Sequence, residues 1–125
     1  MIDLTDLMER YVAIWNEPDA TRRRAQIETL WVPDGGHFTK TRDVRGYPAL
    51  EARVGEAYEK FVADGSRIFR PWGEPDGHHD TVRLHWCMMP TDGGPTAALG
   101  FDFLVLAPDG RIQTDYQYVL PTPTA

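Results

Sequence analysis

Residues 96–120 read TAALGFDFLVL, APDG and RIQTDYQYVL, two runs rich in β-forming residues joined by a short loop. Gly110 can supply the positive φ that a tight hairpin turn needs, so the pattern predicts a hairpin of two long strands. A single acid, Asp102, stands between Phe101 and Phe103 in the first run. Because burying a bare carboxylate is costly, an acid here must be solvated, paired or neutral. Asp102 is therefore the leading candidate for chemistry.

The composition predicts one small globular domain. The chain has 125 residues, of which 42% are hydrophobic and 11% aromatic, enough for one core and too few for two. The net charge of −6 argues against nucleic acid or an anionic membrane as a partner, since both need a basic surface. No apolar run reaches the roughly 20 residues of a membrane span, and no signal peptide is recognisable. Cys87 is the only cysteine, which excludes an internal disulfide and favours a cytoplasmic protein.

Periodicity predicts helices in the first half of the chain and strands in the second. Helices are expected over about 4–15, 20–31 and 48–62, the last one stopped by Gly65. Pro33–Gly36 should end the second helix. Strands are expected over about 37–42, 67–72, 81–89, 96–106 and 111–120. Residues 1–120 should form a single domain, followed by an extended tail at 121–125.

This order of elements predicts an α+β fold. Three N-terminal helices should pack on a strongly curved antiparallel sheet and so form a cone-shaped barrel with an internal cavity. Such a cavity is a natural site for a small hydrophobic molecule.

Short motifs in a fixed order extend over nearly the whole chain. They are Arg10–Ala13, Leu30–Asp34, Arg45–Gly46, Gly100–Asp102 and Asp109–Ile112. In these motifs the chain resembles the nuclear transport factor 2-like superfamily, whose fold is a cystatin-like α+β cone. The resemblance is to its SnoaL-like branch of polyketide cyclases and to ketosteroid isomerase. It implies a SnoaL-like domain that needs no cofactor and commonly forms a homodimer, but no single activity, because the fold hosts isomerases, hydrolases, cyclases and non-catalytic binders.

The resemblance to ketosteroid isomerases implies roles for two residues. In those enzymes a Tyr of the first helix and an Asp of the penultimate strand form an oxyanion hole, and they match Tyr11 and Asp102. A neutral Asp and a Tyr hydroxyl both donate, and two donors aimed at one oxygen stabilise an enolate. The general-base Asp of that family would fall at Thr39, which cannot take a proton near neutral pH. His37, of the same parity, is the candidate base instead.

Two other relatives leave alternatives open. The acid on the last strand of SnoaL-type cyclases matches Gln117, which can position a substrate but cannot act as a base, and Asp115 lies two residues earlier on the same face. Limonene epoxide hydrolase uses an Asp-Arg-Asp arrangement to activate water. Asp102 and Asp115 with an arginine such as Arg83 could imitate it.

The remaining candidates follow from strand alternation and helical spacing. Of His85 and Trp86, which lie on opposite faces of their strand, His85 is favoured as the residue that faces the cavity. The expected pocket-lining residues are Trp15, Trp31, Thr39, Tyr58, His85, Leu104, Asp115 and Gln117. No metal site is expected, because His78 and His79 point to opposite faces and no third ligand is suitably spaced.

The other face of the sheet should be aromatic. If Asp102 points into the cone, then Phe101, Phe103, Tyr116 and Tyr118 point out of it. A monomer rarely leaves such a patch in water, so the pattern predicts a homodimer through the outer sheet face.

Two functions from different classes are compatible with the sequence. The first is a cofactor-independent isomerase, cyclase or hydratase acting on a carbonyl or polycyclic substrate. Tyr11 and Asp102 would then polarise the carbonyl oxygen while His37 or Asp115 moves a proton. The second is a non-catalytic small-molecule-binding or dimeric assembly module. The ionisation of Asp102 distinguishes them, because a strongly raised pKa beside an accessible cavity favours the enzyme.

Overall fold

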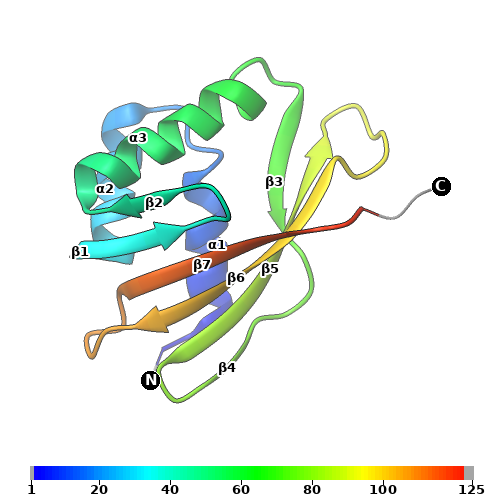
Figure 1. The fold of residues 1–125 in the computed structure, drawn as a ribbon. Helices are drawn as coiled ribbons and strands as arrows, with labels where there is room; N and C mark the ends of the chain where they lie inside the picture. The colour runs from blue at the N-terminus through cyan, green and yellow to red at the C-terminus, as the bar shows by residue number, and fades with distance from the viewer. Residues whose placement is uncertain (1, 123–125) are drawn as a thin grey trace.

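The computed structural model describes residues 2–122, which form three α-helices and a seven-stranded sheet (Figure 1). The helices are α1 (Leu4–Ile14), α2 (Ala20–Leu30) and α3 (Tyr47–Ala57), and α3 continues as the π-helical turn η1 (Tyr58–Val62). The strands are β1 (Trp31–Phe38), β2 (Asp43–Arg45), β3 (Arg67–Pro71), β4 (Asp76–His78), β5 (Thr81–Pro90), β6 (Ala98–Leu106) and β7 (Ile112–Leu120). Of the tail expected at 121–125, residues 123–125 lie outside the described range.

The fold is α+β, as predicted. Its sheet is curved, but it does not close into a barrel of antiparallel strands. Its order is β2-β1-β7-β6-β5-β3, with β4 paired to β5, so within residues 2–122 β2 forms one edge and β3 and β4 share the other. The expected hairpin of β6 and β7 is confirmed, and Gly110 in its turn has φ 89°. The expectation of a wholly antiparallel sheet was wrong, because β1 runs parallel to β7. This parallel pairing places the first strand beside the last.

Side-chain caps begin the first two helices. The carboxylate of Asp3 accepts from the backbone N–H of Asp6 at 3.1 Å, and Asp19 does the same for Arg22 at 3.0 Å. Each cap satisfies a backbone donor that the first helical turn leaves free. The apolar stripe of α1 is buried as its spacing predicts, including Tyr11 at 2% exposure.

The segment between α2 and α3 differs from the prediction. Pro33–Gly36 does not form a turn, since β1 begins directly at Trp31 and runs through these residues. The pairing of β1 with β7 shifts register between Trp31 and Gly36, so this part of the strand is bulged. At Gly35 a Cβ atom would lie 2.7 Å from Cδ1 of Trp31, which leaves room only for glycine.

The strand also ends earlier than expected. β1 stops at Phe38, and the backbone N–H of Thr39 donates to the carbonyl of Arg42 at 3.1 Å, which closes a turn into β2. Thr39 therefore lies in a turn and not on the strand. A second local difference is β4, which forms where the Gly- and Pro-rich sequence indicated only a connection.

The core lies between the helices and one face of the sheet, and all three helices contribute to it. Alternate residues of the long strands face this core, as the period of two predicts: Val82, Leu84, Trp86 and Met88 from β5, and Leu104 and Leu106 from β6. His85 consequently lies on the outer face, where its ring is 5.7 Å from those of Trp72 and Phe101. The choice of His85 over Trp86 as the inward residue was wrong. None of the described helices is long and apolar enough to cross a membrane.

Candidate functional site

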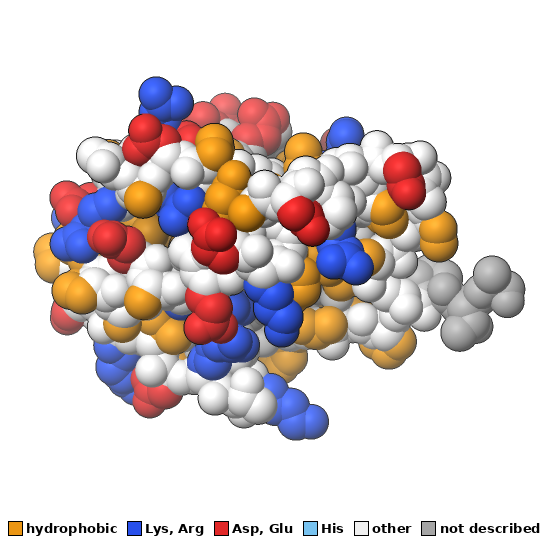
Figure 2. Space-filling model, turned by 90° about the horizontal axis from the view of Figure 1, so that it is seen from above, with side chains coloured by type: hydrophobic (Ala, Val, Ile, Leu, Met, Phe, Trp, Pro, Cys, Tyr) orange, Lys and Arg blue, Asp and Glu red, His pale blue; other side chains and the backbone are white. Residues whose placement is uncertain are grey.

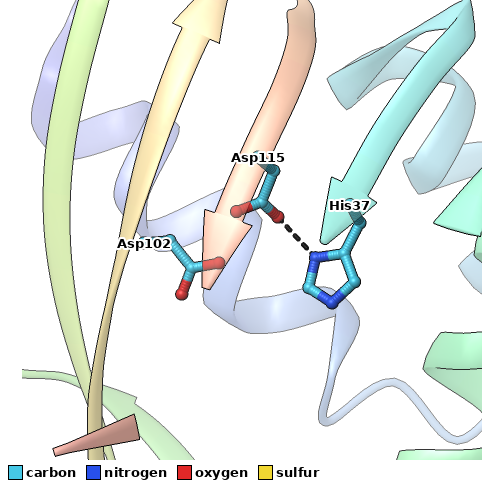
Figure 3. Close-up of side chains that lie close together, drawn as sticks. All are labelled: His37, Asp102 and Asp115. Atoms are coloured by element: carbon cyan, nitrogen blue, oxygen red, sulfur yellow. Dashed lines mark hydrogen bonds and ion pairs between the residues drawn. The ribbon is translucent and has the colours of Figure 1, made fainter. Parts of the chain in front are cut away.

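Four polar side chains from four different elements meet in the core. They are Tyr11 of α1, His37 near the end of β1, Asp102 in the middle of β6 and Asp115 of β7. None is more than 2% exposed. Because β7 lies between β1 and β6, Asp115 pairs in register with His37 and lies close to Asp102. Figure 3 shows the carboxyl group of Asp115 between the imidazole ring of His37 and the carboxyl group of Asp102.

Short hydrogen bonds join these groups into one network, called the acid cluster below. The hydroxyl oxygen of Tyr11 lies 2.7 Å from Oδ2 of Asp102 and 2.6 Å from Oδ2 of Asp115. Nδ1 of His37 lies 2.7 Å from the same Oδ2 of Asp115. The indole N–H of Trp86 donates to Oδ1 of Asp102 at 2.8 Å.

The number of available hydrogens indicates that at least one of the two carboxyl groups is neutral. Tyr11 has one hydroxyl hydrogen, so it can donate to only one of the two carboxyl groups that it contacts. Its other contact needs a hydrogen from a carboxyl group. Oδ1 of Asp115 is buried without a partner among the described residues, and in Figure 3 it points toward Asp102. One carboxyl proton can satisfy Tyr11 or Oδ1 of Asp115, so at least one of the two acids is neutral, and the pKa shifts identify which one.

Burial shifts the pKa of each acid in the same direction. The pKa of Asp102 is raised well above its usual value of 3.8, first by burial and then by the charge and hydrogen bond of Asp115. Burial also raises the pKa of Asp115, to about 6, while hydrogen bonds from Asp102 and Tyr11 and the charge of Arg53 oppose this rise. At neutral pH a proton therefore stays on Asp102 and leaves Asp115.

His37 and Tyr11 are both neutral at this pH. Burial lowers the pKa of His37 to about 4, so its contact with Asp115 is a hydrogen bond from a neutral ring. Burial, followed by the charges of Asp102 and Asp115, raises the pKa of Tyr11 well above 10. With Nδ1–H of His37 donating to Asp115, its Nε2 is left as an acceptor.

Arg53 of α3 reaches the acid cluster, and the sequence-based interpretation missed it. Its Nε donates to Nε2 of His37 at 3.4 Å, and its guanidinium carbon lies 5.3 Å from the centroid of the Trp15 ring. The arginine proposed from sequence, Arg83, is exposed and lies 3.5 Å from Asp76, away from the two acids. The helical spacing of position 53 from Leu50 indicates that it faces inward, and this was the available signal.

A pocket of about 370 Å³ lies against the acid cluster. This volume is within the range of small-molecule sites. Tyr11 is the one cluster member in its wall, while Asp102, Asp115 and His37 lie behind that wall. This pocket is called the aromatic pocket below, because Tyr11, Trp15, Phe61, Phe69 and Trp86 form much of its wall. The polar side chains in the wall are Arg42, Arg53, Glu56, Lys60 and Gln117.

The expected pocket-lining residues fall into three groups. Trp15 and Gln117 line the aromatic pocket, and Thr39 and Gln117 line an adjoining hollow of about 500 Å³. Trp31, Leu104 and Asp115 are fully buried in the core and line neither space. Tyr58 lies under the guanidinium of Arg23, 4.7 Å from it, and His85 is on the outer face, so neither of them lines the two spaces.

Three members of the acid cluster, His37, Asp102 and Asp115, also form a potential cation site. One ligand atom from each of His37, Asp102 and Asp115 lies within 4.8 Å of the others, and imidazole and carboxylate groups bind divalent metals. The hydroxyl of Tyr11, however, bonds to Oδ2 of both carboxyl groups. A cation bound to both of these oxygens would have to displace that hydroxyl.

No protein-family model and no curated protein sequence matches the chain. Among solved structures, the chain is similar to a candidate isomerase of the SnoaL-like family from Agrobacterium tumefaciens. The identity is 27%, the match covers 94% of this chain and 97% of that one, and the TM-score is 0.85. An NTF2-like protein with a cystatin-like fold from Novosphingobium aromaticivorans is 22% identical, with coverages of 92% and 78% and a TM-score of 0.68.

A candidate polyketide cyclase from Sinorhizobium meliloti is 14% identical, with coverages of 90% and 94% and a TM-score of 0.67. Together these matches confirm the resemblance to the nuclear transport factor 2-like superfamily and to its SnoaL-like proteins. The two matches below 25% identity speak for the fold alone.

Proposed function

We propose that this chain is a cofactor-independent enzyme that moves a proton on a small hydrophobic carbonyl compound bound in the aromatic pocket. The observation that carries the proposal is the acid cluster behind the pocket wall. It combines a neutral acid, Asp102, with an ionised one, Asp115, whose pKa of about 6 suits a base near neutral pH. The similar SnoaL-like candidate isomerase supports the same reaction class.

The carbonyl oxygen would meet the acid cluster at Tyr11, because that residue lines the pocket. The hydroxyl of Tyr11 would donate to this oxygen, while the acid proton of Asp102 would donate to the hydroxyl oxygen of Tyr11. Negative charge that develops on the substrate oxygen is then stabilised by two donors in series. Asp115 is preferred to His37 as the group that takes the proton from carbon, since a pKa of about 6 makes a stronger base than one of about 4. Because the Tyr11 hydroxyl covers Oδ2 of Asp115, the substrate would gain access to this base only when that hydroxyl turns to the carbonyl oxygen.

A second candidate function is non-catalytic binding of a small hydrophobic molecule in the same pocket. The observation that favours it is that Asp102, Asp115 and His37 lie behind the pocket wall. In that case the acid cluster would only hold Tyr11 and Trp86 in place as parts of the wall.

Exchange of carbon-bound hydrogen in D2O distinguishes the two functions, because it reports proton transfer whatever product is formed. Cyclic and polycyclic ketones are incubated with the protein, and NMR follows the loss of the signal from hydrogens next to the carbonyl. We expect the wild type to accelerate exchange for at least one ketone by about 100-fold or more, the usual contribution of a positioned acid or base. Asp115→Asn should abolish the acceleration, and Arg83→Gln on the outer face is the matched control.

Two outcomes contradict the enzymatic proposal. If ketones raise the melting temperature but never exchange, the chain is a binding module. If Asp115→Asn exchanges as fast as the wild type, Asp115 is not the base.

A further inference from the structure

The walls of the two adjoining spaces carry a local excess of positive charge. Arg42, Arg53 and Lys60 line the aromatic pocket, and among the described residues only Glu56 opposes them there. The second space shares Arg42 and Arg53 and adds Lys40, with no described acidic residue in its wall. The whole chain has the opposite sign, with a net charge of −6. On the face drawn in Figure 2 acidic and basic side chains are interspersed.

Among the described residues, Arg53 is the one half-buried cation in these walls, since Lys40, Arg42 and Lys60 are exposed. Arg42 forms an ion pair with Glu56 at 2.7 Å, whereas Arg53 has no ion pair within residues 2–122. Its one hydrogen bond, from Nε, goes to the neutral ring of His37. The two terminal nitrogens of the guanidinium, with four N–H donors, form no hydrogen bond to the described residues.

The surroundings hold this guanidinium in place and withhold solvent from it. Arg53 is half-buried, and burial, followed by the positive charge of Arg42, lowers its pKa. The face of Trp15 lies beside it, and His37 fixes its Nε. A guanidinium that is partly desolvated and has an open fork is stabilised strongly by a bidentate anion.

The buried carboxylate of Asp115 does not take this role. Its Oδ2 is bonded to Tyr11 and His37, and it lies beyond ion-pair distance from Arg53. The charge of Arg53 lowers the pKa of Asp115 from a distance, but the fork of Arg53 stays open toward the pocket that it lines.

We infer that the ligand is an apolar molecule that carries a carboxylate, with its apolar body in the aromatic pocket and its carboxylate bound by Arg53. A planar carboxylate matches the two parallel N–H groups of a single guanidinium. Arg42 and Lys60, in the same wall, add attraction for an anion. This inference names the ligand class for the proposed function, and it rests on that proposal only in taking the pocket as the ligand site.

Matched pairs of acids and amides test the inference. The probes are 3-phenylpropanoate, 2-naphthoate and a fused three-ring carboxylate, each paired with its primary amide, and titration calorimetry at pH 7.5 measures binding. We expect at least one acid to bind the wild type at least about 10-fold more tightly than its amide, as a charge-assisted bidentate contact should. Arg53→Gln should bring this ratio close to one while changing the affinity for the amide by less than about 2-fold. Arg83→Gln should leave the ratio unchanged.

Arg53→Lys serves as a second variant, which keeps the positive charge but loses the two parallel N–H groups. Its preference for the acid over the amide should fall by at least about 3-fold relative to the wild type. A ratio near one in the wild type, or a ratio that survives in both Arg53 variants, overturns the inference. Failure of every acid to bind overturns it as well. The D2O experiment uses neutral ketones, so it decides the proposed function independently of this result.

Discussion

Replacing Asp102 with Asn tests whether this buried acid is neutral in the folded protein. The Oδ1 atom of Asn can accept the indole N–H of Trp86, as Oδ1 of Asp102 does. Its Nδ2 group then presents two N–H donors on the side of Tyr11 and Asp115, where protonated Asp102 would present its single O–H donor. Because the hydrogen-bond pattern is preserved, we expect Asp102→Asn to fold.

A neutral Asp102 makes the unfolding free energy depend on pH. The folded pKa of Asp102 is raised above the usual 3.8, so the folded chain keeps a proton that the unfolded chain releases. This contribution to stability is full below pH 3.8 and is lost as pH rises toward the folded pKa. The slope for one proton is about 1.4 kcal/mol per pH unit. Asp115, with a folded pKa of about 6, and His37, whose pKa is lowered from 6.5 to about 4, have made most of their changes by pH 7.

The assay is urea denaturation, followed by tryptophan fluorescence at pH 7 and pH 8. We expect the unfolding free energy of the wild type to fall between pH 7 and pH 8, by at most about 1.4 kcal/mol for one proton, and that of Asp102→Asn to fall much less. Asp76→Asn, at an exposed acid of β4, is the matched control and should keep the wild-type slope. Equal slopes in the wild type and Asp102→Asn would refute a neutral Asp102. A variant that stays unfolded at both pH values would contradict the hydrogen-bond pattern assigned to the acid cluster.

Two further predictions concern the packing of β6 and the outer sheet face. Gly100→Ala should lower the unfolding free energy by about 1–3 kcal/mol in urea denaturation, because a Cβ atom would overlap the Trp86 ring and lie 2.8 Å from the backbone oxygen of Tyr118; an unchanged midpoint would contradict the close packing at this glycine. We also propose a homodimer through the outer face, where Tyr118 is 53% exposed and stacks on Phe101 at 4.8 Å. Sedimentation velocity should give a dimer for the wild type and a monomer for Tyr118→Lys, and a wild-type monomer at all concentrations would disprove the proposal.

Local patterns in the sequence predicted most of the secondary structure and part of the site. The helical spacing in α1 predicted that Tyr11 is buried, and strand alternation predicted that Asp102 and Asp115 face inward while Tyr116 and Tyr118 face outward. These predictions succeed because each depends on a period of 3.6 or 2 within one element. The bulge in β1 escaped prediction, since Pro and Gly at residues 33–36 read as a turn in isolation.

The tertiary structure decided which of these residues meet. The parallel pairing of β1 with β7 brings His37 against Asp115, and it joins segments that are 78 positions apart. The packing of α3 on the sheet places Arg53 beside His37, and the choice between His85 and Trp86 depends on which face of β5 the helices cover. The sequence by itself thus determined most of the elements and the inward acids. The protonation states of these acids and the position of Arg53 beside His37 depend on burial and on contacts between distant segments, which no local pattern encodes.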